Sequence, residues 1–143
     1  MDAKPNYLYM RIALRFLKET RLLKDWKGYL ERVPSYNRHW SNFSSIDFIF
    51  STTWFSRYII KEKLKEKTDN FVVPIFTLFA YWLIENGYDK KMLSKNAIYE
   101  IKANEKILPD IITVDAKNKK TTINWDVFPT KNYCKRYNKK NVW

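Results

Sequence analysis

The sequence predicts an α+β fold, with helices in the first two thirds of the chain and a small antiparallel sheet in the last third. Three observations lead to this prediction. Apolar residues recur at three- and four-residue steps near the N-terminus, an almost wholly apolar run lies in the middle, and the pattern changes to alternation from residue 97 onward. A run of helices followed by a run of strands is typical of the α+β class.

The first predicted helix covers about residues 6–27. Its apolar side consists of Tyr9, Ile12, Ala13, Phe16, Leu23, Trp26 and Leu30. Its other side carries the cations Arg11, Arg15 and Lys18. Gly28 and then Pro34 are predicted to end it, because both residue types interrupt helices.

Two interpretations remain open for the next segment. Ser44 with Asp47 three residues later resembles a capping box, which would open one long helix. Alternatively, Ile46–Phe50 is a short strand of β-branched and aromatic residues, followed by a helix over about 53–67. In both interpretations the charged end "KEKLKEK" is helical, because its acids and lysines can pair at neighbouring turns.

The third predicted helix covers about residues 72–86. Pro74 suits its first turn and Gly87 its end. The helix is apolar on nearly every side, so it is predicted to be the central helix of the core. A short helical turn is expected to follow, near residues 90–94.

Three strands are predicted in the last third, over about 97–103, 107–115 and 121–128. The stretch "AIYEIKA" alternates its apolar residues with Glu100 and Lys102, and the last two strands are joined by the loop "AKNKK". Ile123 and Trp125 are expected to face the core. Residues 1–130 are thus predicted to form a single α+β domain, and residues 131–143 a separate basic-aromatic C-terminal arm.

The charge of the chain predicts an anionic partner. The formal net charge is +12, and residues 117–143 carry 8 basic side chains against 1 acidic one. Aromatic residues reach 17%, more than a small core usually holds. A basic, ring-rich surface is expected to contact nucleic acid or an acidic protein surface.

Composition also excludes several kinds of site. The 2 glycines rule out a Gly-rich phosphate loop, and 1 cysteine with 1 histidine rules out an internal disulfide, a thiolate zinc site and a His-rich metal site. No cofactor and no metal are therefore predicted. The N-terminal stretch lacks the pattern of a signal peptide, and the main apolar run, residues 71–84, is too short to span a bilayer. The expected location is the cytoplasm of a host cell or a virion, without secretion.

The sequence suggests one enzymatic alternative. Glu100 and Lys102 form the Glu-x-Lys pair that restriction-type nucleases place on a strand, with Asp89 upstream as a second acid. The same pair is common on the wet face of any strand. His39 and Cys134 lie in no spacing that defines a triad. No catalytic residue is therefore predicted.

The candidate binding residues are those that mix cations with rings, the combination used both to grip phosphates and to anchor protein interfaces. Two come from the stretch "YNRHW", namely Arg38 and Trp40. The others lie in the C-terminal arm: Lys131, Tyr133, Lys135, Arg136, Tyr137, Lys139, Lys140 and Trp143.

The resulting functional prediction is a small, basic, non-enzymatic structural or assembly protein of a larger complex. The 20 lysines against 7 arginines fit an AT-rich genome, and a bacteriophage or mobile element is the expected source. Two alternatives remain open at this point. One is a nucleic-acid-binding regulator or host-takeover and anti-defence protein, and the other is the metal-dependent nuclease.

Overall fold

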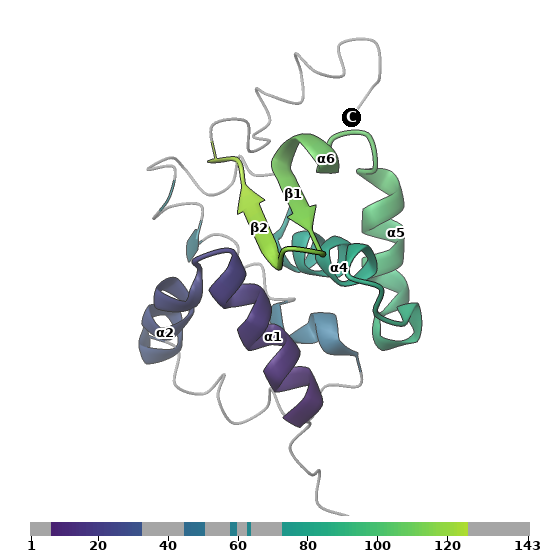
Figure 1. Cartoon of the computed structure of the whole chain (residues 1–143). Coiled ribbons are helices and arrows are strands. Elements are labelled where there is room, and N and C mark those ends of the chain that lie inside the picture. Colours follow the sequence, from purple (N-terminus) through teal and green to yellow (C-terminus); the bar gives the residue numbers. More distant parts are fainter. Residues whose placement is uncertain (1–6, 33–44, 51–57, 60–62, 64–72, 126–143) are drawn as a thin grey trace, which may run out of the picture.

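The computed structural model describes residues 7–32, 45–50, 58–59, 63 and 73–125 (Figure 1). The elements are helices α1 (Tyr7–Glu19), α2 (Leu23–Arg32), α4 (Ile75–Glu85), α5 (Lys95–Ala103) and α6 (Leu108–Ile111), the 3-10 helices η3 (Ile46–Phe50) and η5 (Lys90–Met92), and strands β1 (Ile112–Asp115) and β2 (Lys120–Ile123). The two strands form an antiparallel sheet. The α+β class is confirmed.

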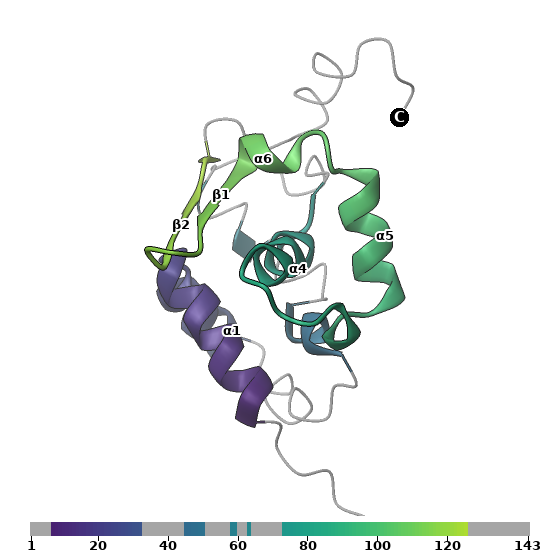
Figure 2. The same cartoon turned by 45° about the vertical axis from the view of Figure 1, so that its right-hand side comes forward.

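Helix α4 is the central helix, as its all-round apolar sequence predicts. Figure 2 shows it nearly end-on, with α1, the β1–β2 hairpin, α6 and α5 placed around it. Its buried residues are Ile75, Phe76, Thr77, Leu78, Phe79, Ala80, Trp82 and Leu83. Pro74 is the residue before its first turn, and Gly87 follows its end with a left-handed φ of 81°.

Four aromatic rings form the centre of the core. Phe16 of α1 lies 4.9 Å from Phe79 and 5.4 Å from Trp82 between ring centroids. Phe50 of η3 packs edge-on against Phe79 at 4.9 Å. All four side chains are fully buried. Tilted and edge-on pairs at this spacing each contribute about 0.5–1.5 kcal/mol beyond area burial, so these rings join α1, η3 and α4.

The first helix is divided in two, which corrects the prediction of one helix over residues 6–27. Helix α1 ends at Glu19 and α2 begins at Leu23. The amide of Leu22 donates to the carbonyl of Leu17 at 2.8 Å, and that of Arg21 donates to the carbonyl of Lys18 at 3.2 Å. These two bonds form a Schellman turn, with Arg21 at the left-handed position. Its φ is 64°.

Gly28 does not end a helix, contrary to prediction, because α2 runs through it to Arg32. A Cβ at this position would lie 2.6 Å from the hydroxyl oxygen of Tyr58. Gly28 therefore allows Tyr58 to approach the backbone of α2 closely.

Segment 97–103 is a helix, α5, and the predicted strand there is wrong. The Ser94 hydroxyl accepts a hydrogen bond from the amide of Ala97 at 3.1 Å and so caps the helix. The buried carboxylate of Asp47 in turn accepts from the Ser94 amide at 2.7 Å and from its hydroxyl at 2.6 Å. Tyr99, expected on an apolar face, is 68% exposed. The capping contacts from Ser94 and Asp47 thus favour a helix in a segment whose alternating pattern predicted a strand.

The sequence left two interpretations open for the segment that follows Ser44. Ile46–Phe50 is neither a strand nor an α-helix but the 3-10 helix η3. Of the helix predicted over 53–67, residues 58–59 and 63 are described and are helical, and the remainder lies outside the described residues.

The predicted strand over 107–115 divides into α6 and β1, because Pro109 suits the first turn of a helix. The pairing of β1 with β2 runs from Ile112 opposite Ile123 to Asp115 opposite Lys120.

The strand predicted over 121–128 begins one residue early, at Lys120, and β2 ends at Ile123. Ile123 is buried as predicted, whereas Trp125 lies past the strand and is only half-buried. Residues 126–128 lie outside the described part.

The apolar run at residues 71–84 is predicted to be too short to span a bilayer. None of the helices in the described ranges combines the length and the apolar character that a membrane crossing requires.

Candidate functional site

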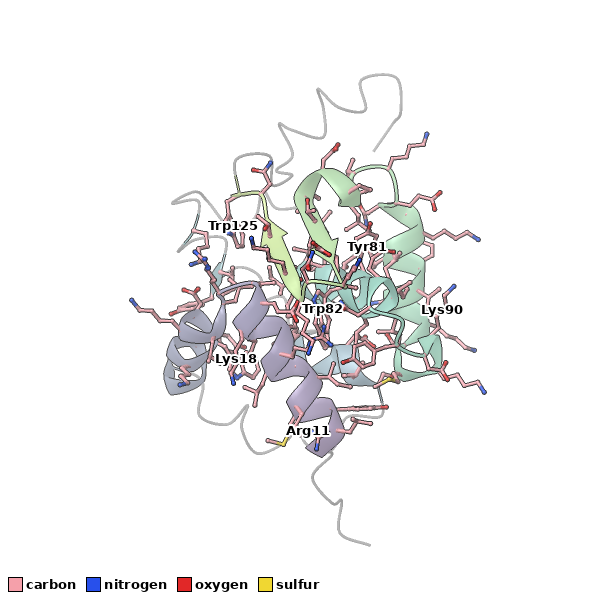
Figure 3. The ribbon with its side chains drawn as sticks, viewed as in Figure 1. Arg11, Lys18, Tyr81, Trp82, Lys90 and Trp125 are labelled. Carbon is pink, nitrogen blue, oxygen red and sulfur yellow. The ribbon has the colours of Figure 1, made fainter. Side chains whose placement is uncertain are left out.

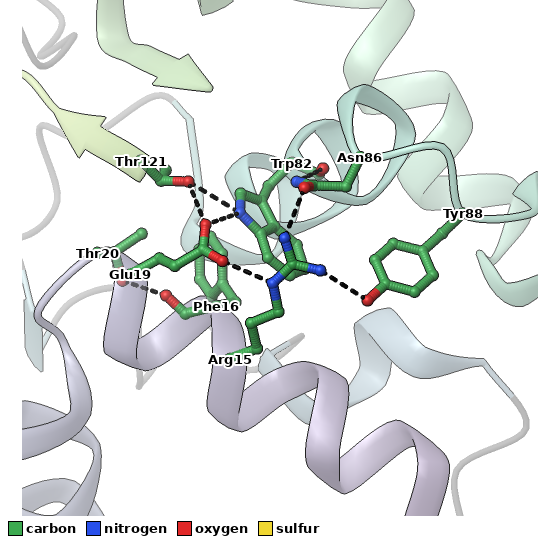
Figure 4. A network of polar contacts seen from close by, with 8 residues as sticks. All are labelled: Arg15, Phe16, Glu19, Thr20, Trp82, Asn86, Tyr88 and Thr121. Atoms are coloured by element: carbon green, nitrogen blue, oxygen red, sulfur yellow. Dashed lines mark hydrogen bonds and ion pairs between the residues drawn. The ribbon is translucent and has the colours of Figure 1, made fainter. Parts of the chain in front are cut away.

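Six polar or aromatic side chains form one hydrogen-bonded cluster where α1, α4 and the hairpin meet (Figure 4). We call it the inner network. Its members are Arg15, Glu19, Trp82, Asn86, Tyr88 and Thr121. It joins segments that are up to 102 positions apart in the chain.

Arg15 uses its guanidinium to bridge α1 to the end of α4. Its Nε donates to Glu19 Oε2 at 2.6 Å, and its two terminal nitrogens donate to the Tyr88 hydroxyl at 3.1 Å and to Asn86 Oδ1 at 2.9 Å. The same group lies 5.2 Å from the centroid of the Trp82 ring. Arg15 is therefore both ion-paired and stacked, an arrangement that a lysine could not reproduce.

Glu19 is the most enclosed charge of the network. Its Oε1 accepts from Trp82 Nε1 at 3.1 Å and from the Thr121 hydroxyl at 2.8 Å, while Trp82 Nε1 also donates to Thr121 Oγ1 at 2.9 Å. The Glu19 side chain is 10% exposed. An α1 carboxylate thus holds an indole of α4 and a hydroxyl of β2 together.

The pKa values of the ion pair reflect these contacts. Burial raises the pKa of Glu19, but hydrogen bonds from Arg15, Thr121 and Trp82 outweigh it and hold the pKa below its ordinary value. Burial likewise opposes the charge of Arg15, yet its bonds to Glu19 and Tyr88 raise its pKa. Both groups are therefore charged at neutral pH and neutralise each other. We interpret the inner network as structural.

A groove of about 440 Å³ lies beside the inner network. It runs between the α1–α2 turn and strand β2, and Figure 3 shows Trp125 at its β2 side. We call it the basic groove. Its lining residues are Glu19, Thr20, Arg21, Lys63, Lys120, Thr121, Thr122, Ile123 and Trp125. Glu19 and Thr121 belong to both features, so the inner network forms one wall of the groove.

The charges of the groove do not cancel. Glu19 is neutralised by Arg15, and Lys63 by Asp25, whose Oδ2 lies 3.0 Å from its Nζ. Arg21 and Lys120 make no ion pair within the described ranges. Lys120 does face Asp115 across the hairpin and helps to lower the pKa of that carboxyl, but hydrogen bonds from Asn118 are the main cause. Among the described residues, Arg21 and Lys120 are therefore the groove cations that no carboxylate pairs with.

The structure leaves the predicted binding residues untested. Arg38, Trp40 and all the arm residues from Lys131 to Trp143 lie outside the described residues.

The Glu100 and Lys102 pair lies on helix α5 and not on a strand, so it lacks the geometry that suggested a nuclease. The Asn104 amide contacts Glu100. Within the described ranges, no group of three or more His, Cys, Asp or Glu side chains could hold a metal.

Sequence reasoning missed the basic groove. The sequence pattern predicts Arg21 inside a continuous helix and Lys120 in the loop "AKNKK", for which no function is predicted. One signal was available: residues 18–21 are all polar, so positions 19 and 20, where a continuous helix would repeat the apolar side after Phe16, carry no apolar residue. That polar run coincides with the turn that exposes Arg21.

Comparisons with known proteins add no relative. No family model matches the chain, and neither a curated protein nor a solved structure shows significant similarity to it.

Proposed function

We propose that this protein is a non-enzymatic, basic binding component of a larger assembly, which contacts a polyanionic partner: nucleic acid or an acidic protein surface. A bacteriophage or mobile element is the proposed setting. The observation that carries the proposal is the basic groove, where Arg21 and Lys120 line a concavity without carboxylate partners among the described residues. Uncompensated cations in a concave surface raise the local concentration of anions.

The surrounding structure supports a binding role. Glu19, the acid that lines the groove, is neutralised by Arg15 and by two neutral donors. The positive potential at the groove therefore persists although an acid forms part of its wall. The cations predicted in the C-terminal arm would add to the same electrostatic attraction.

The proposal is tested by direct binding of the full chain to two labelled polyanions, an oligo(dT) and a poly-glutamate, followed by fluorescence anisotropy. We expect binding to at least one at about 50 mM salt, with a steep loss as salt rises. Failure to bind either polyanion at low salt would overturn the proposal. Magnesium-dependent cleavage of the oligonucleotide that is abolished by Glu100→Ala would instead show an enzyme.

A further inference from the structure

Three features of the described residues place charged or apolar side chains at the surface. The outer face of α1 presents Leu8 and Leu14 with Arg11 and Lys18, and α5 presents Tyr99 between lysines. Both faces are convex, and neither indicates one kind of ligand. The basic groove differs, because it combines concavity, cations, hydroxyls and an aromatic ring.

The two kinds of lining group match the two parts of a nucleotide. Arg21 and Lys120 can approach phosphate oxygens, and the exposed Thr122 lines the same groove. Trp125 supplies a ring whose half-exposed part borders the groove. A positively charged groove with an aromatic platform is the usual arrangement of proteins that bind single strands.

The concave shape distinguishes a single strand from a duplex. A duplex presents its phosphates on a convex surface and keeps its bases stacked inside, so the ring of Trp125 at a groove wall could not reach a base face. A single strand can place phosphates and an unstacked base in the groove together. An acidic peptide would satisfy the cations but would make no use of the ring for stacking.

The backbone of Arg21 is a second, independent observation. It holds the left-handed position of a Schellman turn with a φ of 64°. Glycine adopts this conformation without steric cost, whereas a residue with a side chain does not. An arginine here is costly for the fold but places a cation at the groove, and such local strain is typical of functional positions.

We propose that the basic groove binds single-stranded nucleic acid, with Arg21 and Lys120 contacting successive phosphates and Trp125 stacking on a base. This inference rests on the proposed function and deepens it, since it selects one class of polyanion and one site. Lys63 contributes less to the binding of phosphates, because it is paired with Asp25.

The test compares two double variants of the full chain that have the same net charge. R21Q/K120Q removes the two groove cations, and K91Q/K102Q removes two exposed lysines of η5 and α5, on the other side of α4 (Figures 1 and 2). Each is titrated with fluorescein-labelled oligo(dT) at several salt concentrations. Each phosphate contact of a single strand contributes about 0.7 to the magnitude of the slope of log affinity against log salt. Because R21Q/K120Q removes two such contacts, we expect the magnitude of its slope to be smaller than that of the wild type by about 1.4. The control should lose markedly less.

Trp125 is tested separately with two substitutions. Trp125→Ala should weaken oligo(dT) binding about tenfold, because stacking on one base is lost, whereas Trp125→Phe should retain most of the affinity. A thermal melt of each variant shows whether it remains folded. If W125A unfolds, the W125F variant and the charge variants still decide the question.

The outcomes separate this inference from the proposed function. If the chain binds oligo(dT) equally well with and without its groove cations, the groove is not the site, although the proposed function stands. If it binds poly-glutamate or a DNA duplex in preference to oligo(dT), the inference of a single-strand site is overturned. If it binds no polyanion, both fail.

Discussion

The inner network and the basic groove share Glu19 and Thr121, but they differ in whether their charged side chains are paired. In the inner network the carboxylate of Glu19 meets three donors, and Arg15 meets three acceptors. On the groove side, Arg21 and Lys120 face outward without an ion-pair partner in the described part of the chain. Charges a few residues apart are thus paired within the fold on one side and exposed on the other.

The largest loss of stability is expected from substitution of Trp82, because this side chain belongs both to the core and to the inner network. Trp82→Ala should cost about 3–5 kcal/mol, because it empties a fully buried site and removes the indole donor. Urea unfolding measures this loss. Trp82→Phe is the control, which keeps one aromatic ring in the core but loses the N–H and part of the ring volume. It should cost about 1–2 kcal/mol, and equal losses for both variants would contradict a role for ring volume.

Glu19→Gln is the next largest change, since it leaves the half-buried Arg15 without its anion. We expect a loss of about 1–3 kcal/mol at neutral pH. The folded pKa of Glu19 is lowered, so its stabilising contribution is present above the unfolded pKa of about 4.3 and is lost as the pH falls through the folded value.

The predicted loss of stabilisation at low pH is tested by measuring the free energy of unfolding of the wild type and of E19Q at several pH values. The difference in free energy between them should narrow below about pH 4. A difference that stays constant down to low pH would show that the charge of Glu19 does not stabilise the fold.

Thr121→Val sharpens the comparison with a smaller effect. The substitution keeps the shape of the buried side chain but removes the hydroxyl that accepts from Trp82 and donates to Glu19. We expect a loss of about 1 kcal/mol in chemical unfolding. Thr122→Val is a matched control on the same strand, because Thr122 is exposed, and its stability should be nearly unchanged. An equal loss in both variants would exclude the network as the cause.

The smallest expected change has the opposite sign. Arg21→Gly should raise the free energy of unfolding by up to about 1 kcal/mol, because glycine relieves the left-handed backbone at that turn. Arg21→Gln keeps the strain and should leave stability unaltered. Both variants should bind oligo(dT) more weakly. A less stable R21G would show that the Arg21 side chain supports the fold.

The sequence was sufficient to predict features set by strong local patterns. The all-round apolar character predicted a central helix over about residues 72–86, and α4 covers Ile75–Glu85, with Pro74 just before it instead of in its first turn. The last hairpin was predicted through its alternating residues, and Ile123 faces the core as expected. The α+β class followed from these two segments.

The missed features depend on contacts between distant segments. Helix α5 is capped by Ser94, which Asp47 holds from 47 positions away, and no local pattern contains that bond. The basic groove joins the α1–α2 turn to β2, so its residues are neighbours only after folding. The predicted binding residues in the C-terminal arm remain predictions.

The long-range bond between Glu19 and Thr121 has a consequence for the time course of folding. Contacts between residues 102 positions apart form slowly, because a long loop must close before they gain any enthalpy. During synthesis α1 leaves the ribosome long before β2 does, and the groove has only one wall in that interval. Arg21 therefore acquires its neighbours from β2 late. A chain that is still being translated should not capture its ligand at this site before the hairpin has emerged.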